Sequence, residues 1–475
     1  MSKKKFLVLV LCAAPVFMTL MSGCGGASQS GVPTLVWWQI GPSVTGFNED
    51  LKIISDYTQE KIGVRIDVKL AGWADANQRF STMVNAGEYF DIMFVDKSTY
   101  NRFASLGALA DITDIVSDES PELKAVVPEV LWEGIKIKGR IYSVPTYKDS
   151  SKTGYYFWDD RYVQKYGIDL NKTGWAYLDG VFRKIKAGEG DHFYPMILGR
   201  PSNNFIFDSY DMLSLDLGPI GVRLDDENRR VVNTLEQTDI QEALRYHHSW
   251  YKSGIINPDA NMVDEWPKNR PFFIAQAWPS VAISYALLGG IEKYDAVKFF
   301  GPSYSNESIQ GSMNAVSVNS KYKKEAVKFL ELVNTDKKLR DMIGYGIEGK
   351  YFQYVNDGAA VHQLRDDWPL TNYQEGNYFI ETPLDAVPEN YWNEVLELNE
   401  QAIQSTMLGF MPDITPIQNE MMNCRTIWDK YKYDLQTGAV DPDVILPKLT
   451  VELKANGFDK LMEEIQRQID EYFKQ

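Results

Sequence analysis

The sequence predicts an exported α/β protein whose N-terminal part is built on a parallel sheet. Three observations lead there: an export signal stands at the start, strand-like and helical segments alternate over the next seventy residues or so, and the 475 residues suffice for roughly two or three domains. The alternation favours strands joined by helices over a helical bundle or an all-β fold.

The first 23 residues have the order of an export signal. Lys3 to Lys5 precede an apolar stretch from Phe6 to Leu20, and small residues follow it. This stretch is shorter than the roughly 20 apolar residues that span a bilayer, and Pro15 interrupts it. We therefore predict a signal peptide over residues 1–23.

Cysteine usage bears on the residue after this signal. The chain contains only Cys12, Cys24 and Cys424, and Cys12 lies inside the predicted signal peptide, so we expect no disulfide if Cys24 carries a lipid. "MSGC" resembles the lipobox of bacterial lipoproteins, with Met21 where that family usually has leucine. The resemblance implies a diacylglyceryl group on Cys24 and a flexible tether over 24–33, rich in glycine and serine. The alternative is an ordinary signal peptide cut elsewhere, which leaves a free thiol.

Charge and composition narrow the possible partners. The formal net charge of -16 argues against nucleic acid and against electrostatic binding to anionic lipid. Aromatic residues make up 13% of the chain, with 12 Trp and 27 Tyr, and aromatic faces suit sugar rings or protein partners. A large core also uses many aromatic residues, so this composition alone does not decide between the two.

The segments from residue 34 to 95 repeat strand and helix. "TLVWWQI" (34–40) is a short apolar run rich in strand formers, and apolar residues from Phe47 to Tyr57 then recur at helical spacing. "VRIDVKL" (64–70) alternates strictly, a second helix ends at Gly87, and "FDIMFV" (90–95) has the pattern of a buried strand. Strands joined this way pair in parallel by default. Ligands bind at the carboxyl ends of such strands, here the loops starting at Gln39, Ala71 and Asp96.

Two later stretches continue the pattern. Residues 139–157 hold two strand-like pieces, which could also form a hairpin in a single α/β domain. Residues 311–354 hold a strand, a helix and a short helix that we expect to begin near Thr335 and end before Gly344. At the C-terminus, Leu461, Ile465 and Ile469 stand four apart and predict an amphipathic helix.

Both stretches resemble the extracellular solute-binding proteins of ABC importers, the sugar-binding family that includes maltose-binding protein. In that family the chain crosses to the second lobe within the first stretch. It returns through a helix that appears here as Glu325-Ala326-Val327-Lys328-Phe329-Leu330, followed by Thr335-Asp336. The tail from residue 435 to 470 resembles a lipoprotein subgroup of the same family.

The resemblance implies a two-lobed, periplasmic-binding-protein-like α/β fold, each lobe a sheet flanked by helices, joined by a hinge. We expect lobe 1 over 34–145 and 303–348, and lobe 2, with a C-terminal helical region, over 146–302 and 349–475. The predicted hinge segments are 142–146, 301–303 and 349–351.

A sugar site needs charged or polar side chains for hydrogen bonds and flat aromatic side chains for stacking. The chain offers such mixtures at expected strand ends and crossings, and the resemblance places a stacking aromatic near Trp278. Each candidate could instead be a core aromatic or a surface ion pair. The candidate ligand residues are Trp38, Trp73, Asp96, Lys97, Tyr147, Lys148, Asp149, Arg200, Trp278, Tyr345, Glu348 and Tyr351.

Catalytic and metal motifs are missing from the sequence. It has four histidines and no H-E-x-x-H, nucleophile elbow or phosphate-binding loop, and we expect a structural or surface role for the pair His247-His248. Adjacent acids such as Asp225-Asp226 belong to expected loops, and no calcium-loop pattern is present. We predict no catalytic residue, no metal site and no cofactor.

The resemblance implies a monomeric binding protein held by lipid on the extracytoplasmic face of the cell membrane. It would close on a carbohydrate, with an oligosaccharide as the favoured ligand, and deliver it to the permease subunits of an ABC transporter. Two other functions stay open, a lipid-anchored surface glycan hydrolase and a sensor or adhesion lipoprotein on the same fold. A peptide or amino-acid ligand is also open.

Overall fold

A computed structural model of the protein describes residues 31–200, 202 and 204–474. The predicted signal peptide and Cys24 lie outside these residues, as does most of the predicted tether. No helix in the described part of the chain is long and apolar enough to cross a membrane.

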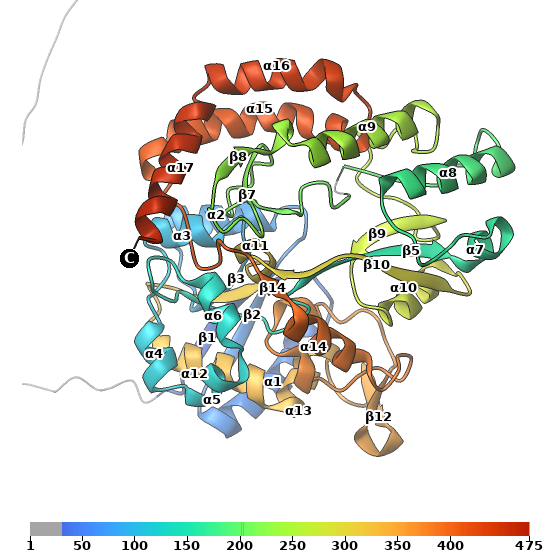
Figure 1. Ribbon diagram of the computed structural model, residues 1–475. Helices are drawn as coiled ribbons and strands as arrows, with labels where there is room; N and C mark the ends of the chain where they lie inside the picture. The colour runs from blue at the N-terminus through green and yellow to red at the C-terminus, as the bar shows by residue number, and fades with distance from the viewer. Residues whose placement is uncertain (1–30, 201, 203, 475) are drawn as a thin grey trace, which may run out of the picture. The chain divides into compact units, whose positions relative to one another are not determined.

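Five strands form the first sheet, in the order β2-β1-β3-β11-β4, and Figure 1 labels β1, β2 and β3 among them. They are β1 (Thr34–Ile40), β2 (Arg65–Ala71), β3 (Ile92–Val95), β4 (Ser143–Pro145) and β11 (Met313–Val316). Strand β1 pairs in parallel with β2 and β3, as the strand and helix alternation predicts, whereas β11 runs antiparallel to β3 and β4. The predicted parallel layer is confirmed, and a return strand from much later in the chain completes the sheet.

Helices cover this sheet and share one hydrophobic core with it. They are α1 (Phe47–Ile62), α2 (Ala76–Ala86), α3 (Tyr100–Ser105), α4 (Thr113–Asp118), α5 (Pro121–Val126), α6 (Glu129–Ile135), α12 (Lys323–Thr335) and α13 (Lys337–Tyr345). In the core the ring of Trp37 on β1 meets Phe329 on α12 edge to face, with centroids 5.3 Å apart. Helix α2 ends where Gly87 takes a left-handed φ of 65°, at the predicted position.

The end of α13 differs from the prediction. The helix runs through Gly344 to Tyr345, and Gly346, with φ 96°, ends it. Gly344 instead allows close packing, because a Cβ there would lie 2.7 Å from a carboxylate oxygen of Glu381 and 2.9 Å from the amide oxygen of Asn372. The glycine is thus explained by a tertiary contact, which sequence spacing does not reveal.

Four strands form the second sheet, in the order β14-β10-β5-β9. They are β5 (Lys152–Asp159), β9 (Phe272–Gln276), β10 (Tyr294–Tyr304) and β14 (Ile403–Gln404). Helices α7 (Asp160–Tyr166), α8 (Trp175–Glu189), α10 (Val281–Gly289) and α14 (Tyr391–Gln401) pack around it. Because β4 belongs to the first sheet and β5 to the second, residues 139–157 cross between sheets, and the hairpin alternative is wrong.

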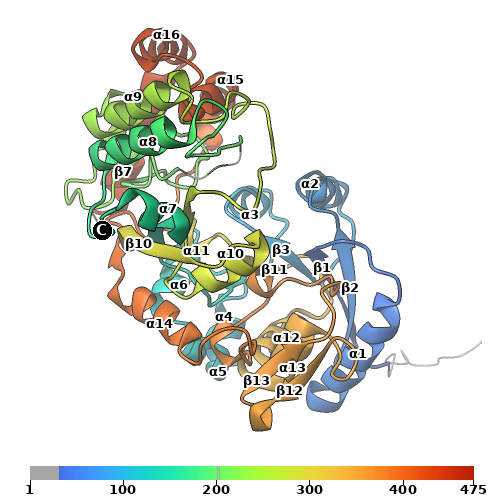
Figure 2. The ribbon, with the colours of Figure 1, turned by 90° about the vertical axis from the view of Figure 1, so that its right-hand side faces the viewer.

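The C-terminal helices pack with a small sheet into a further core (Figures 1 and 2). This group contains β6 (Tyr210–Asp211), β7 (Ile220–Arg223), β8 (Val231–Asn233), α9 (Thr238–Lys252), α15 (Gln418–Thr437), α16 (Pro442–Ala455) and α17 (Phe458–Tyr472). Leu461, Ile465 and Ile469 of α17 are all buried in it, which confirms the predicted amphipathic helix. Shorter elements complete the chain: α11 (Asn306–Ile309), β12 (Phe352–Val355), β13 (Ala360–Gln363) and the 3-10 helices Thr234–Glu236, Asn356–Gly358, Asn372–Gln374, Tyr378–Ile380 and Thr415–Ile417.

The two main sheets, each with its own core and flanking helices, give the two-lobed α/β architecture that the sequence predicts. The residue boundaries of the lobes remain a prediction. Tyr351, Trp368 and Leu370 pack in the core of the first sheet, although they follow the expected boundary at residue 348. This packing favours counting residues 351–370 with lobe 1.

Candidate ligand-binding cleft

An exposed tryptophan and a half-buried tyrosine lie together at the carboxyl end of the first sheet. Trp73 follows β2 and is 53% exposed, and its ring lies 6.1 Å from that of Tyr373 at a tilt of 30°. Phe94 of β3 supports Tyr373 edge to face from below, at 6.3 Å. We call Trp73 and Tyr373 the aromatic ledge. An exposed indole beside a phenol is the kind of surface on which a sugar ring stacks.

Hydrogen bonds hold the segment that carries Tyr373 against the ends of β1 and β11. The side chain of Gln374 accepts a hydrogen bond from the Ile40 amide at 3.0 Å and donates one to its carbonyl at 3.1 Å. The Asn314 side chain of β11 donates to the Gln374 carbonyl at 2.8 Å, and Ser312 donates to the Tyr373 carbonyl at 2.5 Å. The ledge is therefore fixed to β1 and β11.

Lys97, which follows β3, reaches from this edge into a group of carboxylates. Its ammonium lies 2.9 Å from Glu307 of α11. Burial lowers the pKa of Lys97, but Glu307, Asp216 and Asp208 outweigh burial and raise it above the ordinary value. Asp208 is also ion-paired with Lys152 at the start of β5. The carboxylates of Glu307, Asp216 and Asp208 thus keep the Lys97 ammonium charged.

Three adjoining cavities lie around these charges. The largest has a volume of about 420 Å³, and Lys97, Lys152, Asp208 and Glu307 line both it and a second cavity of about 260 Å³. A third cavity, also of about 260 Å³, shares Gln276 with the second. We call the three together the cleft. Its walls come from the second sheet and from α15, with Lys97 reaching in from the loop after β3. The largest of the three cavities has the size of a small-molecule site.

Of the predicted residues, Lys97, Lys148 and Arg200 line the cleft, and Asp149 contacts Gln276 of its wall. Trp73 and Asp96 line none of the three cavities and follow β2 and β3 of the first sheet.

Their contacts differ. Lys148 pairs with Asp149 at 2.8 Å, and the Gln276 amide donates to the Asp149 carbonyl at 2.9 Å. Arg200 lines the largest cavity and donates to Asp264 at 2.9 Å. Asp96 accepts from the backbone amides of Ser98 and Thr99 at 3.0 and 3.2 Å, so it mainly orders the loop that carries Lys97.

The other predicted aromatics are packed against protein. Trp38 contacts Phe80, and Tyr147 contacts Phe379 at 4.4 Å. Trp278 is only 9% exposed, and Tyr391 and Trp392 cover it.

Three predicted residues near the return stretch also lie away from the cleft. Tyr345 is buried and donates to the Thr382 carbonyl at 2.8 Å. Tyr351 is buried and donates to Asp50 at 2.9 Å. Glu348 is exposed in the turn before β12 and lines none of the three cavities. These contacts describe packing roles, and ligand contact at these positions stays a prediction.

Sequence reasoning missed three residues that line the cleft, Lys152, Asp208 and Glu307, and also Tyr373 of the aromatic ledge. Lys152 lies within the stretch 139–157, and Glu307 lies shortly after the predicted hinge segment 301–303. Their closeness to these crossings could have identified them as candidates. Tyr373 and Asp208 come from irregular segments whose position depends on tertiary contacts, and no pattern points to them.

A buried ion pair fixes the far side of the ledge segment. Arg340 of α13 lies 2.7 Å from Glu381, and both side chains are completely buried. The guanidinium also donates to the Asn372 carbonyl at 2.9 Å and the Asn377 carbonyl at 3.2 Å. Arg340 therefore holds residues 372–381 on the core.

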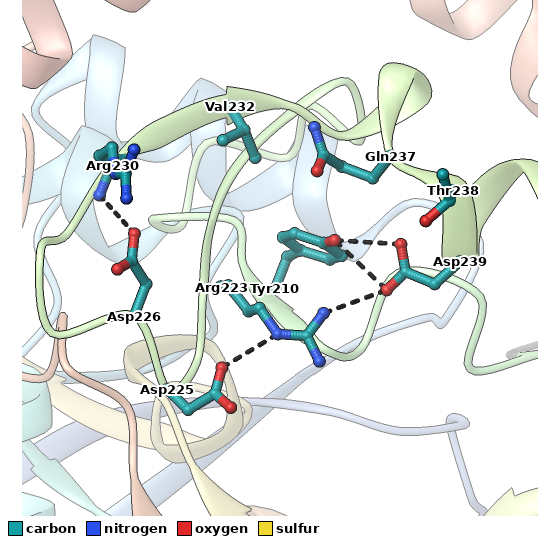
Figure 3. A pocket seen from close by; sticks show the side chains of 9 residues that line it. All are labelled: Tyr210, Arg223, Asp225, Asp226, Arg230, Val232, Gln237, Thr238 and Asp239. Atoms are coloured by element: carbon teal, nitrogen blue, oxygen red, sulfur yellow. Dashed lines mark hydrogen bonds and ion pairs between the residues drawn. The ribbon is translucent and has the colours of Figure 1, made fainter.

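A further cavity of about 630 Å³ lies beside the small sheet, and its residues are shown in Figure 3. Arg223 lies 3.0 Å from Asp225 and 3.3 Å from Asp239, to which Tyr210 also donates at 3.0 Å. No residue of the first sheet lines this cavity. The cleft, which includes Lys97 from the loop after β3, is therefore a better candidate than this cavity for a binding site shared by two lobes.

The predicted structural role of the histidine pair is confirmed by its contacts. His247 is buried with its ring 2.9 Å from the Ala243 carbonyl, and His248 contacts the Gly438 carbonyl at 2.8 Å. In the described part of the chain, no three His, Cys, Asp or Glu side chains are arranged to hold a metal ion.

Two sheet-based lobes with a polar cleft between them define a solute-binding architecture. The chain belongs to the bacterial extracellular solute-binding protein family, whose model matches residues 52–348. Residues 406–474 match a second model, described as a domain of unknown function (DUF3502).

The relatives agree with this family. A carbohydrate ABC transporter substrate-binding protein of Streptococcus pneumoniae is 27% identical over 94% of this chain and 93% of its own. Lipoprotein LipO of Bacillus subtilis is 22% identical over 69% of this chain and 68% of its own.

Solved structures show the same fold. The N-glycan transport solute-binding protein NgtS of Streptococcus pneumoniae superposes with a TM-score of 0.81 at 24% identity, covering 93% of this chain and 99% of that one. Its complex with Man5GlcNAc gives 0.76 at 25% identity, with coverage of 93% and 99%.

Proposed function

We propose that this protein captures a carbohydrate, with an oligosaccharide as the favoured ligand, in the cleft and delivers it to the permease of an ABC transporter. The observation that carries the proposal is the pairing of the aromatic ledge with the charged and amide groups around Lys97. A sugar needs both stacking faces and hydrogen-bond partners, and Trp73 and Lys97 follow β2 and β3, the two strands that flank β1.

Ligand binding is expected to drive closure of the lobes. Lobes that close by a hinge favour the closed state only if the ligand contacts both of them. The cleft meets this condition, because Lys97 follows a strand of the first sheet and Gln276 ends a strand of the second. The expected hinges lie in the crossings at 142–146 and 301–303. The third predicted segment, 349–351, leads into residues that pack in the core of the first sheet, so we no longer count it as a hinge. The name of the pneumococcal relative supports the carbohydrate ligand and the transporter partner.

A glycan hydrolase is less well supported by the cleft. Such an enzyme uses two carboxyl groups facing one another across the scissile bond. Here Glu307 and Asp208 are each paired with a lysine, Lys97 and Lys152. Release of a shortened product during the binding experiment below would favour the enzyme instead.

The test is a thermal-shift measurement on the chain from Pro33 onward with two probes: Man5GlcNAc, the long probe, and Man1GlcNAc, the short probe, both sugars named with the pneumococcal complexes. A ligand that binds only the native state stabilises it by about 2.7 kcal/mol at a hundredfold excess over Kd. We expect a rise in melting temperature with at least one probe. A rise with a peptide panel and none with either sugar, or with a wider oligosaccharide panel, would overturn the carbohydrate assignment.

The ledge provides a matched variant for the same experiment. Trp73→Ala should weaken sugar binding about tenfold, equivalent to about 1.4 kcal/mol, because it removes the exposed stacking face. Trp73→Phe should restore part of the loss. Met422→Ala, which removes another exposed apolar side chain on the outer side of α15, should leave affinity unchanged.

We also propose that Cys24 carries a lipid that holds the protein at the extracytoplasmic face of the membrane, with residues 24–33 as the tether. Cys24→Ala should move the protein from the membrane fraction to the soluble fraction, since two acyl chains give stable anchoring and their loss abolishes it. Cys12→Ala, inside the predicted signal peptide, serves as the control. Retention of the Cys24 variant in the membrane fraction would contradict the proposal. The relative named as a lipoprotein supports it.

A further inference from the structure

The C-terminal helical unit, which matches the domain of unknown function, forms one wall of the cleft. The largest of the three cavities in the cleft is lined by four residues of α15, together with Lys97 and Lys152. The four are Trp428, Lys432, Tyr433 and Gln436. Their spacing of four, one and three residues places them on one face of the helix. Lys432, Tyr433 and Gln436 thus face the cavity, and Trp428 lies where this face meets the C-terminal core.

The wall is rigidly built. Cys424, Ile427, Trp428 and Leu435 of α15 are buried in the C-terminal core. The Trp428 ring packs so closely on Gly218 that a Cβ there would lie 2.6 Å from it, and Phe207 meets it edge to face at 5.8 Å. A wall fixed in this way can impose geometry on a ligand without ordering itself on binding.

Two contacts join α15 to the loop that lines the opposite side of the same cavity. Arg425 donates to the Leu215 carbonyl at 2.6 Å, and Asn204 donates to the Gln436 carbonyl at 3.1 Å. This loop includes Asp216, which lines the cavity and has a left-handed φ of 51°, a conformation that costs energy outside glycine. Packing against α15 holds the strained loop in place.

The groups on the cavity face are suited to hydroxyl-rich ligands. Lys432 is half-buried and pairs with Asp429 at 2.7 Å, while Arg200 lies 5.9 Å from the Tyr433 ring. Lysine, amide and phenol groups at the end of a helix face can donate to sugar hydroxyls, and the phenol ring adds an apolar surface.

The cavity beside α15 adjoins both other cavities of the cleft, since it shares Lys97 with one and Asn204 with the other. Lys148 and Gln276 line the neighbouring cavity and not this one, so a small sugar can occupy one cavity without reaching the other. A chain of several sugar units is needed to reach both. We propose that the Lys432, Tyr433 and Gln436 face of α15 is a distal subsite that selects longer or branched oligosaccharides. This assigns a ligand-contacting role to the C-terminal unit and rests on the proposed function.

The chain contains its own control for the test. Residues 430–433 read Lys-Tyr-Lys-Tyr, and the first two point away from the cavity: Lys430 and Tyr431 contact Glu452 of α16 at 3.3 and 2.8 Å. The test variant is Lys432→Ala with Tyr433→Ala, and the control is Lys430→Ala with Tyr431→Ala. Both remove the same groups from the same helix.

Affinities for the long and short probes are measured by calorimetry on the chain from Pro33 onward. We expect the test variant to lose at least tenfold affinity for the long probe and to stay within twofold of wild type for the short one, while the control changes neither. Equal affinity of test variant and wild type for the long probe overturns the inference. A parallel loss for both probes also overturns it, because α15 would then act on closure rather than as a distal subsite.

Folding and the proposed function are checked separately. The melting temperature of each variant without ligand shows whether it is folded, and if the double variant is not, Gln436→Ala takes its place with the same expected outcomes. If the wild type binds neither probe nor any other oligosaccharide, the proposed function itself has failed. If it binds the long probe and the variants do so equally well, only the distal subsite has failed.

Discussion

Replacing Arg340 with methionine should lower the free energy of unfolding by about 3–5 kcal/mol, the largest effect we expect from a single substitution in this chain. The change leaves Glu381 buried without its ion-pair partner and removes the donors to the Asn372 and Asn377 carbonyls. Since those carbonyls belong to the segment that carries Tyr373, the aromatic ledge should loosen as well.

The measurement is denaturant unfolding at neutral pH, with the slope of the transition checked for a change in cooperativity. Arg467→Met provides the comparison, because Arg467 pairs with Glu464 and Glu471 on the exposed side of α17, where such pairs contribute about 1 kcal/mol or less. Similar losses in the free energy of unfolding of the two variants would show that the buried ion pair stabilises the protein no more than the exposed one.

Glu375 should make the protein less stable as the pH rises. Burial raises the pKa of its carboxyl to about 8, with Arg340 lowering it and Glu381 raising it, and within the described residues neither carboxyl oxygen has a hydrogen-bond partner. Between the ordinary pKa of about 4.3 and this value, the native state binds more protons than the unfolded state. The free energy of unfolding then falls as the pH rises through that window, by up to about 1.4 kcal/mol per pH unit.

Glu375→Gln removes this dependence while preserving the shape of the side chain. At pH 5 its free energy of unfolding should be close to that of wild type, and at pH 8 it should be higher by about 2 kcal/mol or more. Glu348→Gln, at an exposed position, should match wild type at both pH values. A glutamine variant with the wild-type pH slope would show that another buried group is responsible.

Much of the first lobe could be predicted because its strands and helices have clear local sequence patterns. The alternation of 64–70 defines β2, the apolar run of 34–40 defines β1, and Gly87 ends α2, all as found. The crossing at 139–157 needed the family resemblance, since two adjacent strands read alone fit a hairpin equally well. The small sheet β6-β7-β8 was not predicted at all, because its strands have only two to four residues.

The candidate site was predictable only where it follows regular strands. Trp73, Asp96 and Lys97 stand directly after β2 and β3, so the rule that ligands bind at strand ends found them. Tyr345 and Tyr351 looked equally suitable in sequence, yet both are buried with partners for their hydroxyl groups. Periodicity cannot separate an aromatic at a cleft from one in a core, because the difference depends on contacts from residues far away in the chain.

Because Cys424 is buried, dyes can be attached selectively to introduced cysteines to measure motion of the lobes. The thiol lies in the C-terminal core, and burial raises its pKa to about 11, so it has little of the reactive thiolate at neutral pH. From Pro33 onward it is the single cysteine in the chain. Cysteines introduced at exposed positions, such as Leu106→Cys beside α3 and Leu287→Cys on α10, would therefore react with fluorescent dyes selectively. Energy transfer between the two dyes would then show whether the distance between α3 and α10 changes in single molecules when a sugar is added.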